Sequence, residues 1–325
     1  MSIYKITTLI STLAVVTSLT ACQKQPENQA STSATTEIKT LSIGYQKAAL
    51  KLIVAQKNKI FEQEFPNTKI EWKEFPAGPQ TLEALSVGAI DVGYTGDTPV
   101  IFARAAGKAV NYLGYEKSSQ FAHALLVGVN SPIKNIQDLK GKRIALTKGS
   151  SAHNFLSELL KKAGLTWSDI QPIWLSPADA RAALDKQSVD AWAIWDPYAS
   201  AAEIQGNARV LIDSKDLPQA YSFYLSSPQF LQAHASEANK IIAGLNKADE
   251  WINAHPDQTA QILADSTGLD IKVTQRVIDK KPKPATVSYL SADVIQAQQQ
   301  IADFFYNAKL IPQPVKIKDA VWEGK

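Results

Sequence analysis

The stretch VDAWAIWDPY, residues 189–198, contains the two kinds of segment that recur along the whole chain. Residues 189–194 form an apolar run that predicts a strand. Asp196 and Pro197 then predict the start of a helix, because proline is favoured in a first helical turn. Trp192 and Trp195 point to opposite faces of the strand, since side chains alternate along it. We expect one tryptophan to pack in a core and the other to line a cleft.

Strand patterns alternate with helix patterns on both sides of this stretch. Further strands are predicted at residues 41–45, 68–75, 89–94, 124–129, 143–146, 170–175 and 221–225. Helices are predicted at residues 48–60, 98–106, 152–163, 237–254 and 292–306, with further starts at Gly78-Pro79 and Ser176-Pro177. Alternation of this kind predicts parallel sheets with helices on both faces.

The alternating pattern occurs twice, which predicts an α/β protein with two lobes. We expect residues 41–125 and 225–325 to form lobe 1, including the C-terminal helices, and residues 126–224 to form an inserted lobe 2. In open α/β sheets, ligands sit beyond the carboxyl ends of the strands, and clefts between domains are common ligand sites. The predicted ligand site is therefore the cleft between the lobes.

The N-terminal segment predicts export and attachment to a membrane. Residues 1–21 have one basic residue, Lys5, followed by an apolar run over residues 6–16 that is short for a membrane span. The run ends at LTAC, residues 19–22, which resembles a bacterial lipobox and implies cleavage before Cys22 and acylation of its thiol. Residues 22–40 are polar and predict a flexible tether. The alternative is an ordinary signal peptide followed by a free thiol. We expect a periplasmic or cell-envelope protein, anchored in either the inner or the outer membrane.

The loops that follow the predicted strands supply hydrogen-bond donors and few cations. Gln46, Thr95, Ser150 and Ser151 each stand shortly before a predicted helix, and Gly96 lets the backbone approach a ligand closely. Helix N-termini expose free N–H groups and a partial positive charge, so several of them around one cleft suit an oxyanion. Structural alternatives exist for polar residues in these loops: Ser150, Ser151, Asp97 and Asp196 are also typical helix caps, and His153 is typical of a surface histidine.

The composition excludes several other classes of protein. The net charge is +3 with no block of like charges, so nucleic-acid binding is not expected. Cys22 is the only cysteine, which excludes a disulfide within the chain and a cysteine-based metal cluster. The four histidines have no HExxH spacing, and the chain has no GxSxG, Walker A or GxGxxG motif. We therefore expect no catalysis, no metal and no cofactor.

Six stretches of the chain resemble the aliphatic sulfonate-binding proteins of ABC importers, and the resemblance extends over residues 41–322. They are FPAGPQ at 75–80, TGD at 95–97, NSPIK at 130–134, KGSS at 148–151, PADARAA at 177–183 and VDAWAIWDPY at 189–198. The resemblance implies the type II periplasmic-binding-protein fold. It also implies a monomer that captures an alkanesulfonate for sulfur acquisition and delivers it to a membrane permease and its ATPase. The residues to which it carries over ligand contacts are Gln46, Thr95, Gly96, Asp97, Ser150, Ser151, Trp195 and Asp196, with Tyr224 near the strand that returns to lobe 1.

Other functions remain open from the sequence. The ligand could be another oxyanion, such as taurine, a sulfate ester or nitrate. An amine-bearing ligand would need an acid, which Asp97, Glu116 or Asp196 could supply. Two alternatives from other classes are an enzyme of cofactor biosynthesis on the same fold and a structural surface lipoprotein without a saturable ligand.

Overall fold

The computed structural model describes residues 38–324, and these residues belong to one compact unit. The predicted signal segment, Cys22 and nearly all of the predicted tether lie outside the described residues, while the first strand already begins at Thr40. Among residues 38–324, no helix has the length and apolar character that a membrane span requires.

The first sheet has five strands in the order β2 (Lys69–Glu74), β1 (Thr40–Tyr45), β3 (Val92–Gly96), β10 (Tyr221–Ser226) and β4 (Asn111–Lys117). Strand β1 runs parallel to both β2 and β3, whereas β10 runs antiparallel to both β3 and β4. The first three strands are therefore the parallel part that the sequence predicts, and β10 is inserted between them and β4.

The second sheet repeats this arrangement, with the order β7 (Gln171–Trp174), β6 (Arg143–Leu146), β8 (Ala191–Trp195), β5 (His123–Gly128) and β9 (Ala208–Asp213). Strand β6 is parallel to β7 and β8, and β5 is antiparallel to β8 and β9. The prediction of wholly parallel sheets is thus wrong for one strand in each. Strands β5 and β10 each enter directly from the other sheet, without the helical crossover that parallel neighbours need.

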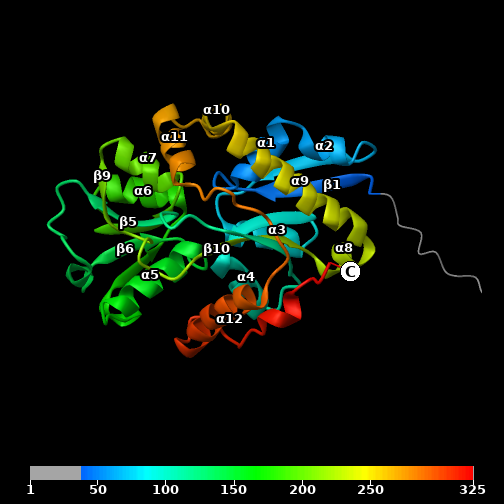
Figure 1. Ribbon diagram of the computed structural model, residues 1–325. Coiled ribbons are helices and arrows are strands. Elements are labelled where there is room, and N and C mark those ends of the chain that lie inside the picture. The colour runs from blue at the N-terminus through cyan, green and yellow to red at the C-terminus, as the bar shows by residue number, and fades with distance from the viewer. Residues whose placement is uncertain (1–37, 325) are drawn as a thin grey trace, which may run out of the picture. The chain divides into compact units, whose positions relative to one another are not determined.

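The helices divide between the two sheets, and we call each sheet with its helices a lobe (Figure 1). Helices α5, α6 and α7 pack on the second sheet, α9 crosses α1 and α2 of the first lobe, and α11 contacts both α10 and α7. The α-helices are α1 (Leu50–Lys57), α2 (Ile60–Glu64), α3 (Gly78–Ser86), α4 (Asp97–Ala105), α5 (Ser151–Lys162), α6 (Pro177–Asp185), α7 (Tyr198–Ile204), α8 (Pro228–Ala233), α9 (Ala235–Ala254), α10 (Pro256–Thr267), α11 (Ile271–Lys280) and α12 (Ala292–Asn307). Short 3₁₀ turns lie at Ile136–Leu139, Trp167–Asp169 and Ile317–Ala320.

Each lobe has its own apolar core. The second lobe is built around residues such as Leu125, Ile144 and Trp192. The first sheet buries side chains on both faces, with Ile43 in one cluster and Phe223 in another. Trp192 is 1% exposed, so it is the tryptophan of the opening stretch that packs in a core.

Most predicted elements are present, in the predicted order. The single helix predicted at residues 48–60 is two helices, because Lys59 adopts a left-handed conformation with φ 54° between them. Strands β4 and β9, which edge the two sheets, had no counterpart among the predicted strands. The predicted domain limits at 125/126 and 224/225 fall within β5 and β10, whereas the chain passes between the sheets at residues 118–122 and 214–220. The domain limits stay predictions.

Candidate ligand-binding site

A cavity of about 150 Å³ lies between the lobes. Gln46 and Gly96 line it from the first lobe, and Ser150, Ser151 and Trp195 line it from the second. These residues lie at or after the ends of β1, β3, β6 and β8. Within each sheet those strands are parallel, so their carboxyl ends meet at one edge, where ligands bind in α/β proteins. The cavity is therefore at the position that the sequence predicts.

Three helices begin at this cavity without a side-chain cap. The cap positions of α3, α4 and α5 are Ala77, Gly96 and Ser150, and none of these side chains accepts a hydrogen bond from its helix. Gly78, Gly96, Ser150 and Ser151 from these helix starts line the cavity. In α4 the Thr98 N–H donates to the Asp97 side chain and Pro99 has no N–H, so the free N–H groups are mainly those of α3 and α5. Together with the helix dipoles they favour a negatively charged group. This end of the cavity is suited to an oxyanion.

The side chains at this end are held in defined orientations. The Gln46 amide nitrogen donates to the carbonyl oxygen of Tyr94 at 2.7 Å. The Ser150 hydroxyl donates to the carbonyl oxygen of Thr147 at 2.8 Å, so Ser150 occupies the cap position of α5 without capping it through its side chain. The Ser151 hydroxyl lies 2.8 Å from Nε2 of His123. Burial lowers the pKa of His123 to about 4, against the opposing effect of the Asp196 charge, so His123 is neutral at pH 7.

Trp195 and Asp196 also line the cavity. Trp195 is 7% exposed and meets Tyr198 edge to face, with ring centroids 6.0 Å apart. Trp195 belongs to the same buried cluster as Trp192 and also lines the cavity, whereas Trp192 does not line it. Asp196 accepts a hydrogen bond from the N–H of Ser200 at 2.9 Å and pairs with Lys280 Nζ at 2.9 Å. It therefore serves both the start of α7 and an ion pair.

Thr95, Asp97 and Tyr224 are not among the residues that line this cavity. Asp97 is the first residue of α4, one position after the predicted cap, and it accepts hydrogen bonds from the N–H of Thr98 at 2.6 Å and from the amide nitrogen of Asn154 at 3.0 Å. Burial raises the pKa of Asp97 to about 6. Thr95 and Tyr224 are buried, and the Tyr224 ring packs on Tyr94. Their role as ligand contacts stays a prediction.

His153 was predicted at the surface, and this is wrong. It is 1% exposed and packs among aromatic rings that include Phe102 and Phe305 of the first lobe and Trp167 of the second. Burial, assisted by the charge of Lys148, lowers its pKa to about 3. A neutral imidazole is compatible with this apolar setting.

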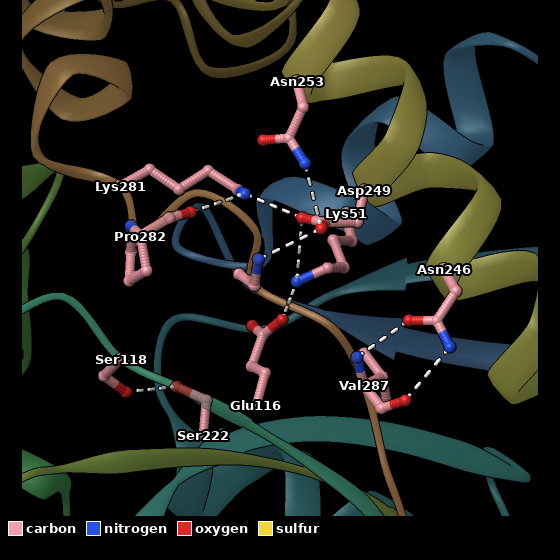
Figure 2. A network of polar contacts seen from close by, with 11 residues as sticks. Lys51, Glu116, Ser118, Ser222, Asn246, Asp249, Asn253, Lys281, Pro282 and Val287 are labelled. Atoms are coloured by element: carbon pink, nitrogen blue, oxygen red, sulfur yellow. Dashed lines mark hydrogen bonds and ion pairs between the residues drawn. The ribbon is translucent and has the colours of Figure 1, made fainter.

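The cavity lining also includes charged side chains that the strand-end loops did not predict. Lys51 forms ion pairs with Glu116 and with Asp249, the latter at 3.6 Å, and Lys281 pairs with Asp249 at 2.7 Å (Figure 2). We call these four residues the charge cluster. The prediction of few cations concerned the strand-end loops and does not extend to the cavity as a whole, whose lining includes Lys47, Lys51, Lys117, Lys280 and Lys281.

The charges in this cluster are deeply buried. Burial lowers the pKa of Lys51 to about 7, although the Asp249 charge acts in the opposite direction. Burial alone would raise the pKa of Asp249, but Lys51, Lys281 and the N–H of Ala285 together hold it below its ordinary value. A lysine within an otherwise apolar helical run, such as Lys51 in LKLIVA, is a sequence signal that could have pointed to this cluster.

In the part of the chain that the structure describes, no group of three or more His, Cys, Asp or Glu side chains is arranged to hold a metal ion. The donors at the cavity are amides, hydroxyls, backbone N–H groups and lysines. This set is suited to binding an anion through hydrogen bonds and charge.

Comparison with known proteins places the chain in a family. The model of the family described as "NMT1/THI5 like" matches residues 46–259. The chain is 44% identical to a putative aliphatic sulfonates-binding protein of Escherichia coli (strain K12), over 97% of this chain and 95% of that protein. Its fold matches the alkanesulfonate-binding protein SsuA from Xanthomonas axonopodis pv. citri bound to MOPS, with a TM-score of 0.85 and 46% identity over 88% of this chain and 99% of that one. The periplasmic aliphatic sulphonate binding protein SsuA from Escherichia coli matches with a TM-score of 0.80 and 46% identity, over 88% and 98% of the two chains. The chain therefore belongs to the NMT1/THI5-like family, within its group of aliphatic sulfonate-binding proteins.

Proposed function

We propose that this protein is the binding component of an ABC importer and captures aliphatic sulfonates in the periplasm. The observation that carries the proposal is the meeting of several helix starts at one cavity, where the first turns of α3 and α5 offer N–H groups that no side chain caps. A sulfonate is an anion at every physiological pH and has three acceptor oxygens. It therefore needs hydrogen-bond donors and no proton partner, and donors are what these helix starts offer.

The remainder of the cavity suits an alkyl chain. Leu50, Leu263 and Val277 line it from α1, α10 and α11. Apolar side chains of this kind gain about 25 cal/mol for each Å² of apolar surface that a ligand buries against them. Alkanesulfonates combine an anionic head with an apolar tail, which matches the two kinds of lining.

The chemistry of the site favours binding over catalysis. Ser151 and His123 are in hydrogen-bond contact, as a nucleophile and a base would be. However, a histidine with its pKa lowered to about 4 is a weak base at neutral pH. The site therefore holds its ligand without transforming it.

The envelope location and the partners belong to the same proposal. Acylation of Cys22 would anchor the protein, and the permease and its ATPase would receive the ligand. The protein would act as a monomer whose lobes are connected by residues 118–122 and 214–220. The test is a Cys22→Ser variant expressed in the native host: it should move from the membrane fraction to the soluble envelope fraction. A variant that stays with the membrane would contradict the anchor.

Calorimetry on ligand-free protein tests the ligand class. Ethanesulfonate and longer alkanesulfonates should bind more tightly than about 100 μM, which corresponds to about −5.5 kcal/mol. Sulfate and nitrate are the matched oxyanions without a tail, and they should bind more weakly. If nitrate or a sulfate ester binds with a dissociation constant below about 100 μM and no sulfonate does, the proposed ligand is wrong.

A further inference from the structure

The charge cluster leaves its carboxylates already paired. Lys51 lies between Glu116 and Asp249, with side-chain exposures of 2%, 12% and 5% (Figure 2). Asp249 also accepts hydrogen bonds from Lys281 Nζ at 2.7 Å and from the N–H of Ala285 at 3.0 Å. Lys51 is thus the shared cation that connects the carboxylate on β4 to the carboxylate on α9.

An ammonium group on a ligand would need a carboxylate at the cavity. Within residues 38–324, the carboxylates that line the cavity are Glu116 and Asp196. Glu116 is paired with Lys51, and Asp196 is paired with Lys280. The third acid considered from the sequence, Asp97, does not line this cavity and is bonded to Thr98 and Asn154. Each acid that an amine could reach therefore already has a lysine.

Displacing one of these lysines is unfavourable. An ammonium that paired with Glu116 would compete with Lys51, whose side chain is 2% exposed and has little access to water. Lys51 would then keep only Asp249, 3.6 Å away and already paired with Lys281, and two cations facing one carboxylate repel each other.

We infer that Lys51 is a specificity-determining residue: by occupying Glu116 it disfavours sulfonates with a primary ammonium tail relative to sulfonates without one. This inference rests on the proposed function of the cavity. It selects among the ligands that the sequence leaves open, and it makes taurine a poor one.

The test compares two ligands of nearly equal size. Taurine and 1-propanesulfonate differ by an ammonium in place of a methyl group, so the ratio of their dissociation constants measures the tail preference alone. For the wild-type protein we expect taurine to bind at least about 30-fold more weakly. In Lys51→Met the freed Glu116 should accept the amine and lower this ratio at least about tenfold.

Two controls separate the role of Lys51 from general damage. Lys57→Met, an exposed lysine on the same helix, should leave the ratio unchanged. Lys51→Met combined with Glu116→Gln should restore the preference against taurine, because the carboxylate that could receive the amine is gone. If Lys51→Met does not fold, Glu116→Gln alone still decides, since it leaves Lys51 less neutralised and should increase the ratio about threefold.

Equal binding of taurine and propanesulfonate by the wild-type protein would overturn the inference while leaving the proposed function intact. The same holds for a folded Lys51→Met variant with an unchanged ratio, or for an unchanged ratio in Glu116→Gln. Failure of the proposed function would look different, because then neither sulfonate would bind.

Discussion

Two of the contacts between the lobes, α4 with α5 and α7 with α11, differ in kind. Between α4 and α5 the contact is close-packed: Gly96 faces Ser151, and the His153 ring meets Phe305 with centroids 4.9 Å apart. Between α7 and α11 the contact consists of ion pairs, Lys280–Asp196 and Arg276–Glu203. Packing is lost within an ångström of separation, whereas charge attraction declines slowly with distance. We infer that the α4–α5 contact defines how closely the lobes approach and that the α7–α11 contact adjusts how long they stay together.

The sharpest way to break the packed contact is at Gly96. A Cβ atom added there would lie 2.6 Å from Cβ of Ser151, closer than side-chain carbons approach in real structures. Gly96→Val should hold the lobes apart and weaken sulfonate binding at least about 300-fold in calorimetry. The backbone at Gly96 has φ −75°, so the substitution adds no backbone strain and the protein should still fold.

Gly128 provides the matched control, because a Cβ added there meets no atom within 4 Å. Gly128→Ala should bind sulfonates as the wild-type protein does, while Gly96→Ala should already show a large loss. Wild-type affinity in Gly96→Ala would mean that the lobes need not approach this closely.

The packed contact also contains a carboxylate that makes stability depend on pH. Burial raises the pKa of Asp97 to about 6, above its value in an unfolded chain. The folded protein then binds more protons than the unfolded chain between about pH 4 and pH 6, so this residue lowers stability as pH rises through that window. In Asp97→Asn this dependence should be absent, so the variant should gain about 2 kcal/mol relative to wild type between pH 4 and pH 6.5.

Urea unfolding of both proteins across that pH range measures the difference in their free energies of unfolding. The contributions of all other titrating groups cancel in this difference. The Asn154 amide oxygen is buried without a hydrogen-bond partner among the described residues, and the amide group that Asp97→Asn introduces could donate to it. A constant difference between variant and wild type over the whole range would show that Asp97 titrates normally.

Of the two ion pairs in the α7–α11 contact, the one formed by Lys280 should have the larger effect on sulfonate binding. Its Nζ bridges Asp196 and the Ser200 hydroxyl, both at 2.9 Å, and it lines the cavity. Lys280→Met would leave Asp196 uncompensated beside an anion site and should weaken sulfonate binding about tenfold. Lys272→Met, on the exposed first turn of the same helix, is the control and should have no effect. If Lys280→Met and Lys272→Met bind sulfonate equally well, the Lys280–Asp196 ion pair does not contribute to ligand binding.

Arg276 should have the smallest effect. Its pair with Glu203 is at the surface, with side chains 47% and 31% exposed, and such pairs contribute about 0.5 kcal/mol that salt screens further. Arg276→Gln should change sulfonate affinity less than about twofold, and roughly 0.5 M NaCl should abolish the change. An effect as large as that of Lys280→Met would show that the outer ion pair, rather than the one at the cavity, holds α11 to α7.

The sequence could predict those features that depend on neighbouring residues, but not those that depend on residues distant in the chain. The helix starts at the cavity were predictable, because strand and helix patterns are local and the carboxyl ends of parallel strands converge. The charge cluster was not, since its members come from α1, β4, α9 and the segment after α11, and no spacing in the sequence links them. His153 was placed wrongly for the same reason: its burial depends on Phe102 and Phe305, which belong to distant segments. The edge strands β4 and β9 were missed because NYLGYEK and ARVLID mix buried with half-buried positions, without a clear alternation.

The exchange of β5 and β10 between the sheets has a consequence for how the chain folds after synthesis. Strand β4 pairs with β10 and not with β3, so the first sheet has no place for β4 until residues 221–226 have been made. A nascent chain that ends at residue 213 already contains all five strands of the second sheet but only four of the first. The lobe begun first is therefore completed last, after all five strands of the second sheet have been synthesised.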